Sequence, residues 1–119
     1  MLARQFRITK KEDFEAAYRQ GKRFFLGPIT MFVRKNGFQL SRFGIVVSTK
    51  FSKYAVDRNR IKRQIREVIR KNGKNIAIGQ DAVLSVRKIK AKTSYKSQEI
   101  EDILVKIFNN AKLINEKKK

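Results

Sequence analysis

The side chains best suited to chemistry lie in one basic stretch, DRNRIKRQIREVIR, at residues 57–70. Read as a helix with about 3.6 residues per turn, its outward side carries a row of polar and basic residues: Asn59, Arg63, Arg66 and Arg70. Arg dominates this row, and a guanidinium group binds phosphate through paired hydrogen bonds. The row has a single Glu near it, Glu67, which we place off to one side. The row therefore predicts a surface that binds a polyanion.

The opposite side of the same helix is apolar and is formed by Ile61, Ile65, Val68 and Ile69. This side predicts attachment to a core, which leaves the basic row facing solvent. Two other interpretations stay open, a merely solvated helix and a membrane-surface helix. The first would usually alternate its charges at i and i+4, and the second would carry Trp, Phe or Leu on its apolar side. Nucleic-acid contact is favoured, although composition does not separate DNA from RNA.

The composition of the whole chain agrees with a nucleic-acid partner. Its 119 residues include 30 Lys and Arg against 10 Asp and Glu, a formal net charge of +20, while 41% hydrophobic residues suffice for a globular core. A polyphosphate backbone releases counterions when such a protein binds it, and an anionic membrane is the competing polyanion. The chain has neither Cys nor His, which excludes thiol nucleophiles, imidazole bases and zinc sites built from these ligands.

The chain also lacks the features of a secreted or membrane protein. The beginning, MLARQFRITKK, has no apolar run of the kind found in signal peptides. No stretch approaches the roughly 20 apolar residues that span a bilayer. We therefore expect a cytoplasmic protein that contacts no membrane and takes no small-molecule substrate.

The pattern along the chain predicts an α-β-β-α-β-α order with one extra strand early. The first helix should begin near Lys10, with Thr9 as its N-cap and Glu12 completing a capping box. Asn36 and Gly37 form a typical hairpin turn signal between PITMFVRK and RFGIVVSTK. The second of these runs is continuously apolar through GIVV, which predicts a strand in the sheet centre or one buried on both faces.

The remaining elements complete a small α+β sandwich. Phe24 and Phe25 indicate a short extended segment before Pro28, and DAVLSVRK at residues 81–88 reads as a strand. Asp57 can cap the basic helix, Asn72-Gly73 should end it, and a last helix is predicted from Tyr95 to Ile114. Helices should cover one or both faces of the sheet. We expect one domain over residues 1–119, ending in a disordered basic tail at 115–119.

The string VDRNRIKRQIRE closely resembles the RNR motif of the bacterial ribonuclease P protein family, named for Arg-Asn-Arg, here Arg58, Asn59 and Arg60. The order of elements is similar over nearly the whole chain, and residues 44–70 carry the specific likeness. The resemblance implies a two-layer α/β sandwich related to a ribosomal-protein domain, with three helices and a small, mostly antiparallel sheet. It also implies a left-handed βαβ crossover, an exception to the right-handed rule.

The same resemblance implies a role and a set of contact residues. The family protein joins a catalytic RNA that removes the 5′ leader of precursor tRNA. The helix residues that contact the catalytic RNA would be Arg58, Asn59, Arg60, Lys62, Arg63, Arg66 and Arg70. A cleft that holds the single-stranded leader would contain Phe14, Tyr18, Phe32 and Lys50. Stacking on aromatic side chains suits a leader of variable sequence, because every base has a π-face.

Each of these assignments has a structural alternative. Phe14 and Tyr18, at i and i+4, have the spacing of ordinary core residues, and Arg58 lies off the outer row, where it can serve as a local partner at the helix start. The loop KFSKYAVD departs from the family, since Ser52 stands where the family has Gly and the segment is one residue longer.

The residue inventory agrees with the catalytic RNA that the resemblance implies. The carboxylates are scattered, and helix starts and surface solubility account for most of them. We expect no catalytic residue and no metal held by protein ligands, with Mg²⁺ bound mainly by the RNA. The alternative function is a non-catalytic RNA-binding protein of ribosomal or nucleoid type. A self-sufficient nuclease is disfavoured.

Overall fold

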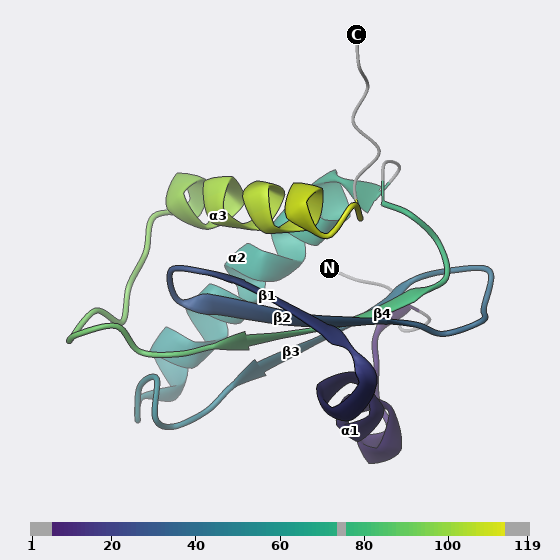
Figure 1. Ribbon diagram of the computed structural model, residues 1–119. Helices are drawn as coiled ribbons and strands as arrows, with labels where there is room; N and C mark the ends of the chain where they lie inside the picture. The colour runs from purple at the N-terminus through teal and green to yellow at the C-terminus, as the bar shows by residue number, and fades with distance from the viewer. Residues whose placement is uncertain (1–5, 74–75, 114–119) are drawn as a thin grey trace, which may run out of the picture.

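Four strands form one mixed sheet, described in a computed structural model over residues 6–73 and 76–113 (Figure 1). The strands are β1 (Lys22–Leu26), β2 (Ile29–Lys35), β3 (Arg42–Val47) and β4 (Gln80–Val86). They lie in the order β1-β2-β4-β3, with antiparallel pairs β1–β2 and β2–β4 and a parallel pair β3–β4. The mostly antiparallel sheet and the early extra strand are confirmed. The predicted tail at 115–119 lies outside the described residues.

Three helices pack on the two faces of this sheet. They are α1 (Lys11–Gln20), α2 (Ala55–Lys71) and α3 (Ser97–Asn110). Figure 1 shows α2 and α3 over one face and α1 on the other. The larger core lies between the sheet and the α2–α3 pair, whereas a smaller cluster around Ile8, Ala17 and Val83 lies under α1. The α+β sandwich is confirmed, and α1 adds partial cover to its second face.

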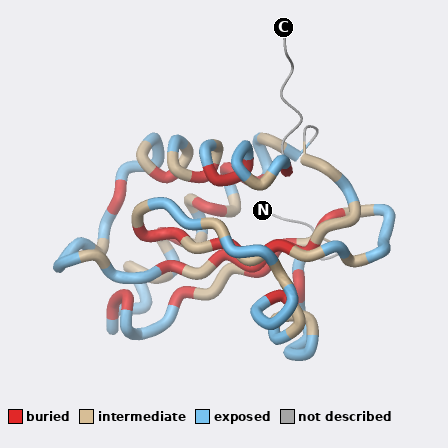
Figure 2. The backbone as a smooth tube through the Cα atoms, viewed as in Figure 1, coloured by how far each residue is buried: buried red, intermediate tan, exposed pale blue. Residues whose placement is uncertain are grey.

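Strand alternation explains why each face has its own core. On β2, Ile29, Met31 and Val33 are buried toward α2 and α3, and the residues between them point toward α1. The buried residues line the inner side of α3 and the middle of the sheet in Figure 2. The face toward α1 is only partly covered, so side chains on the rest of this face are open to solvent.

The predicted hairpin at Asn36-Gly37 is wrong. The two-residue turn of this sheet is Gly27-Pro28, which joins β1 to β2 with Leu26 opposite Ile29 and Gly27 at φ +58°. The strand after Asn36 lies two places away, because β4 inserts between β2 and β3. The Asn36 side chain accepts a hydrogen bond from the Phe38 amide at 2.7 Å, donates to the Leu40 carbonyl at 3.2 Å and reaches β4, so it shapes a crossing loop and not a tight turn.

The strand RFGIVV is also not central. β3 is an edge strand of the sheet, and the central, almost wholly buried strand is β4. The other predicted alternative, burial on both faces, fits its apolar run, since Phe14 of α1 packs on Gly44 from one side and α2 contacts β3 from the other. The parallel pair β3–β4 is joined through α2, which is the βαβ crossover expected from the resemblance. The left-handed sense of this crossover stays a prediction.

The predicted helix caps are corrected by the structure. α1 is capped at Lys10 without a side-chain hydrogen bond, so Thr9 does not cap it. α2 begins earlier than expected, after Tyr54, and Asp57 lies inside its first turn. Its end at Asn72 is confirmed. α3 is shorter than predicted at both ends, since it runs from Ser97 to Asn110, and Ile114 lies outside the described residues. Among the described residues, no helix has both the length and the apolar character to cross a bilayer.

Gly44 on β3 sets how closely α1 approaches the sheet. A Cβ atom at this position would lie 2.5 Å from Cε1 of Phe14 and 2.8 Å from its Cζ. The Phe14 ring therefore rests directly on the β3 backbone, beside Ile8 and Val83. Any residue larger than Gly at position 44 would put its Cβ atom into the space of the Phe14 ring.

We predict that Gly44→Ala lowers the free energy of unfolding by about 1–3 kcal/mol, the usual cost of overpacking. The added methyl group must displace the Phe14 ring and loosen α1. Gly73→Ala is the matched control, since nothing lies within 4 Å of its added Cβ. Urea unfolding measures both variants, and equal stability of the two would contradict the proposed close contact.

Candidate nucleic-acid interface

The apolar side of α2 is buried as the sequence predicts. Ile61, Ile65, Val68 and Ile69 are all in the core against the sheet and α3. Because this side fixes the rotation of the helix, the outer row faces solvent. Asn59, Arg63 and Arg66 converge there on a shallow hollow of ≈ 510 Å³. Donors gathered in this way can bind a phosphate backbone from several directions.

One residue that lines the hollow is acidic, and its predicted place off to one side is wrong. Glu67 lines it together with the basic residues and does not lie off to the side. Its carboxylate accepts a hydrogen bond from Arg70 Nε at 3.2 Å and pairs with the Arg70 guanidinium. This bond to Arg70 lowers the pKa of Glu67 and raises that of Arg70. Arg70 is therefore partly neutralised, whereas Arg63 and Arg66 form no ion pair among the described residues.

The start of α2 is held by a compact set of hydrogen bonds. The Ser52 hydroxyl donates to Asp57 at 2.7 Å and accepts the Tyr54 amide at 3.1 Å, and Arg58 donates to the Ser52 carbonyl at 2.8 Å. Arg58 is thus the local partner at the helix start that its position suggested. Arg60 lies 3.4 Å from Asp57.

The remaining predicted helix residue, Lys62, is half-buried beside the core side. The structure therefore divides the predicted row into two groups. Asn59, Arg63 and Arg66 face outward together, whereas Arg58, Arg60 and Arg70 are engaged within the protein.

The predicted cleft aromatics come together between α1 and the sheet. Tyr18 on α1 meets Phe32 on β2 edge to face, with ring centroids 5.0 Å apart. Phe14 and Tyr18 line a hollow of ≈ 490 Å³ with Val46 of β3, rimmed by Lys11 and Glu15. This hollow is open and mainly apolar, which suits the flat face of a base.

The three aromatics do not play equal parts. Phe14 is mostly a core residue, because its ring rests on Gly44, and Phe32 packs on the same small cluster. Tyr18 is 42% exposed. Partial burial raises the pKa of Tyr18, so its phenol stays neutral at physiological pH and adds no negative charge to the cleft. Lys50 is exposed in the turn after β3 and does not line the hollow.

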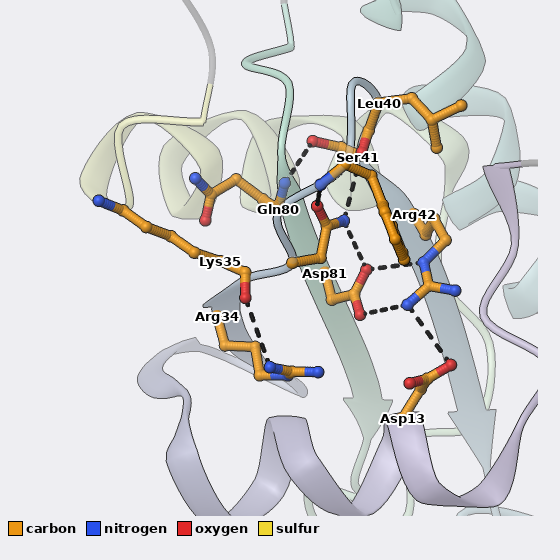
Figure 3. Close-up of polar contacts among 10 residues, drawn as sticks. Asp13, Arg34, Lys35, Leu40, Ser41, Arg42, Gln80 and Asp81 are labelled. Atoms are coloured by element: carbon orange, nitrogen blue, oxygen red, sulfur yellow. Dashed lines mark hydrogen bonds and ion pairs between the residues drawn. The ribbon is translucent and has the colours of Figure 1, made fainter.

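A buried polar network fixes α1 over the sheet (Figure 3). Asp81 on β4 has no solvent exposure and accepts hydrogen bonds from Arg42 Nε at 2.9 Å and Nη2 at 2.7 Å. Asn36 Nδ2 donates to the same carboxylate at 2.8 Å. The Arg42 guanidinium also lies 3.4 Å from Asp13 on α1. The hydrogen bond to Asp81 is the main cause of a raised pKa of Arg42.

This network is not predicted by any pattern in the sequence. Its one local signal is Asp81 itself, a carboxylate at the start of an otherwise apolar strand, DAVLSV. Its partners lie 39 and 45 residues away along the chain, so no spacing rule connects them.

Comparisons with known proteins agree with this architecture. The family model described as Ribonuclease P matches residues 2–112. The ribonuclease P protein component of Pseudanabaena sp. (strain PCC 6903) is 36% identical over 118 residues, which cover 97% of this chain and 98% of that protein. The component from Thermotoga maritima is 35% identical, with 95% of each chain covered.

Solved structures give the same result. The ribonuclease P protein of Staphylococcus aureus has a TM-score of 0.83 at 30% identity and covers 92% of this chain and 98% of its own. That of Thermotoga maritima has a TM-score of 0.78 at 31% identity, covering 87% and 96%. The chain belongs to the ribonuclease P protein family.

The loop KFSKYAVD, which is expected to differ from the family at Ser52, contacts the start of α2. Ser52, which replaces the expected Gly, is 5% exposed and supplies both the hydroxyl and the carbonyl that bind the first turn of α2. Phe51 is completely buried beside it. The centre of this loop is therefore anchored to the first turn of α2.

We predict that Arg42→Ala lowers the free energy of unfolding by about 3–5 kcal/mol, because the Asp81 carboxylate would stay buried without its charge partner. Glu101→Ala is the control, since it removes the exposed pair with Lys71, a change worth about 0–1 kcal/mol. Chemical denaturation of both variants compares the two costs. A small effect of Arg42→Ala would mean that Asn36 and water suffice for Asp81.

Proposed function

We propose that this protein holds two RNAs on opposite faces of its sheet, the catalytic RNA of ribonuclease P on α2 and the 5′ leader of precursor tRNA in the cleft beside α1. As a member of its family, the chain is the protein subunit of a ribonucleoprotein endoribonuclease that matures the 5′ end of tRNA. The observation that carries the proposal is the separation of the two surfaces: the basic row lies on α2, and Tyr18 and Phe32 lie across the sheet from it.

The two surfaces differ in the chemistry that they offer. The α2 row presents guanidinium groups suited to phosphates, which position an RNA without reading its sequence. The cleft presents aromatic faces suited to unpaired bases. A folded catalytic RNA fits the first surface, and a single-stranded leader of variable sequence fits the second.

Cleavage itself is assigned to the RNA. In the described part of the chain, no group of three or more acidic side chains is placed to hold a metal ion. We propose that Mg²⁺ is bound by the RNA and that the protein lowers the repulsion between the two RNA backbones. Since a subunit must meet its RNA partners where they are made and processed, we propose that the protein acts in the cytoplasm with them. The alternative of a ribosomal or nucleoid protein is not favoured by the family match.

Arg63→Ala and Arg66→Ala should each weaken binding of the catalytic RNA and reduce the slope of log K against log salt by about one, the value for one lost phosphate contact. Lys106→Ala on α3 removes an exposed charge away from the row and serves as the control. Filter binding over a salt series gives the slopes. If the slope of the Arg variants equals that of the control, these side chains do not contact phosphate.

Tyr18→Ala should reduce the affinity of the holoenzyme for leader-bearing tRNA by about 1–3 kcal/mol, the value of one base stack, and leave mature tRNA unaffected. Phe14→Ala should instead lower the thermal unfolding midpoint, since its ring fills the space over Gly44. Binding and melting measurements on both variants separate the two roles. A large loss of stability in Tyr18→Ala would place it in the core.

A further inference from the structure

A second exposed aromatic residue lies on the same face of the sheet as the cleft. Phe24 packs on the core beneath α3, so its neighbours Arg23 and Phe25 on β1 point to the opposite face. Phe25 is 57% exposed. The guanidinium of Arg23 lies over its ring, 5.4 Å from the centroid. Neither residue belongs to the leader-binding set derived above.

Strand register places these two residues directly beside the cleft aromatics. Arg23 is the cross-strand partner of Phe32, and Phe25 pairs with Thr30 two residues further along. Diagonal neighbours of this kind lie about 7–8 Å apart on one face, a distance that one nucleotide of an extended strand can span. The face therefore carries a continuous path from Tyr18 to Phe32, Arg23 and Phe25.

The charge along this path favours RNA as the occupant. No Asp or Glu occurs between residues 16 and 56, which include all of β1, β2 and β3. At the turn next to Phe25, Arg87 donates to the Gly27 carbonyl at 3.3 Å and adds an exposed cation. An aromatic ring with guanidinium groups beside it can stack a base and bind its phosphate together.

We propose that Phe25, covered by Arg23, is a second base-stacking position for the single-stranded leader of precursor tRNA, one nucleotide step beyond Tyr18 and Phe32. This inference rests on the proposed function and adds to it a further specificity-determining residue. It makes the β1 edge part of the leader path and extends that path away from the acidic residue Glu15, which lines the hollow near α1.

The test uses the reconstituted holoenzyme and precursor tRNAs whose leaders increase one nucleotide at a time. Phe25→Ala should remove the gain in affinity at one leader length, about five-fold or more for one base stack, and leave shorter leaders unchanged. Phe25→Trp should keep the gain. An abasic nucleotide at that leader position should weaken binding of the native protein and have no further effect on Phe25→Ala.

Phe38→Ala is the matched control. Phe38 is also 54% exposed and also lies under a guanidinium, with Arg42 Cζ 4.9 Å from its centroid, but it belongs to the loop between β2 and β3. The inference fails if Phe25→Ala behaves like Phe38→Ala at every leader length. It also fails if Phe25→Ala changes the oligomeric state of the RNA-free protein in solution, since Phe25 would then contact a second copy. If the native holoenzyme does not distinguish leader-bearing from mature tRNA, the proposed leader function itself fails.

Discussion

The carboxylate of Asp81 is completely buried, and a buried charge is stable in a protein only when it is paired and its oxygens accept hydrogen bonds. The three donors that meet this requirement come from two places: the side chain of Arg42 at the start of β3 and that of Asn36 in the loop after β2. Both side chains must lie within hydrogen-bond distance of the Asp81 carboxylate at the same time. The carboxylate therefore fixes the crossing loop and the pairing of β3 with β4 at the same point.

The cleft depends on this arrangement through a further ion pair. The Arg42 guanidinium that binds Asp81 also meets Asp13 on the first turn of α1. The ring of the next residue, Phe14, rests on Gly44 of the same strand. A charge contact and a packing contact thus hold α1 at two positions over the same strand. The place of Tyr18 above Phe32 follows from them, because Tyr18 lies one turn beyond Phe14 on the same face.

The sequence predicted local features well and long-range ones poorly. Both faces of α2 could be read because a helix repeats every few residues and its four core positions alternate visibly with charge. The strand order could not be read, since β4 pairs with segments far away in the chain. Asn36-Gly37 is a typical turn sequence, but the hydrogen bond from Asn36 to Asp81 holds this segment as a loop that crosses to β3. The predicted cap at Thr9 is also wrong, because the N-cap of α1 is Lys10, one residue later.

In the candidate site, too, the local features were predictable from sequence and the long-range contacts were not. Spacing identified Asn59, Arg63 and Arg66, since residues three and four apart share one face of a helix. It gave no warning that Arg70 is paired with Glu67, because side-chain rotamers decide such pairs. The cleft aromatics were identified through the family resemblance, and the geometry then separated Phe14, whose ring packs on Gly44, from the more exposed Tyr18. Phe25 could not be assigned from sequence, because its face depends on which neighbour is buried.

The carboxylates of this basic protein are used mainly for contacts within the protein itself. Most of the acidic side chains in the described part of the chain already bind a cation, an amide or a hydroxyl of the protein: Asp13, Asp57, Glu67, Asp81, Glu99, Glu101 and Asp102. A hydrolytic site needs carboxylates that converge on a free metal ion or a water. Here they are spread over separate elements, and each orients a nearby group or stabilises a helix start. Lys and Arg remain in large excess, so the surface attracts phosphate almost everywhere. Specific contact must then come from position: guanidinium groups in a row on α2, and aromatic faces in line across the sheet.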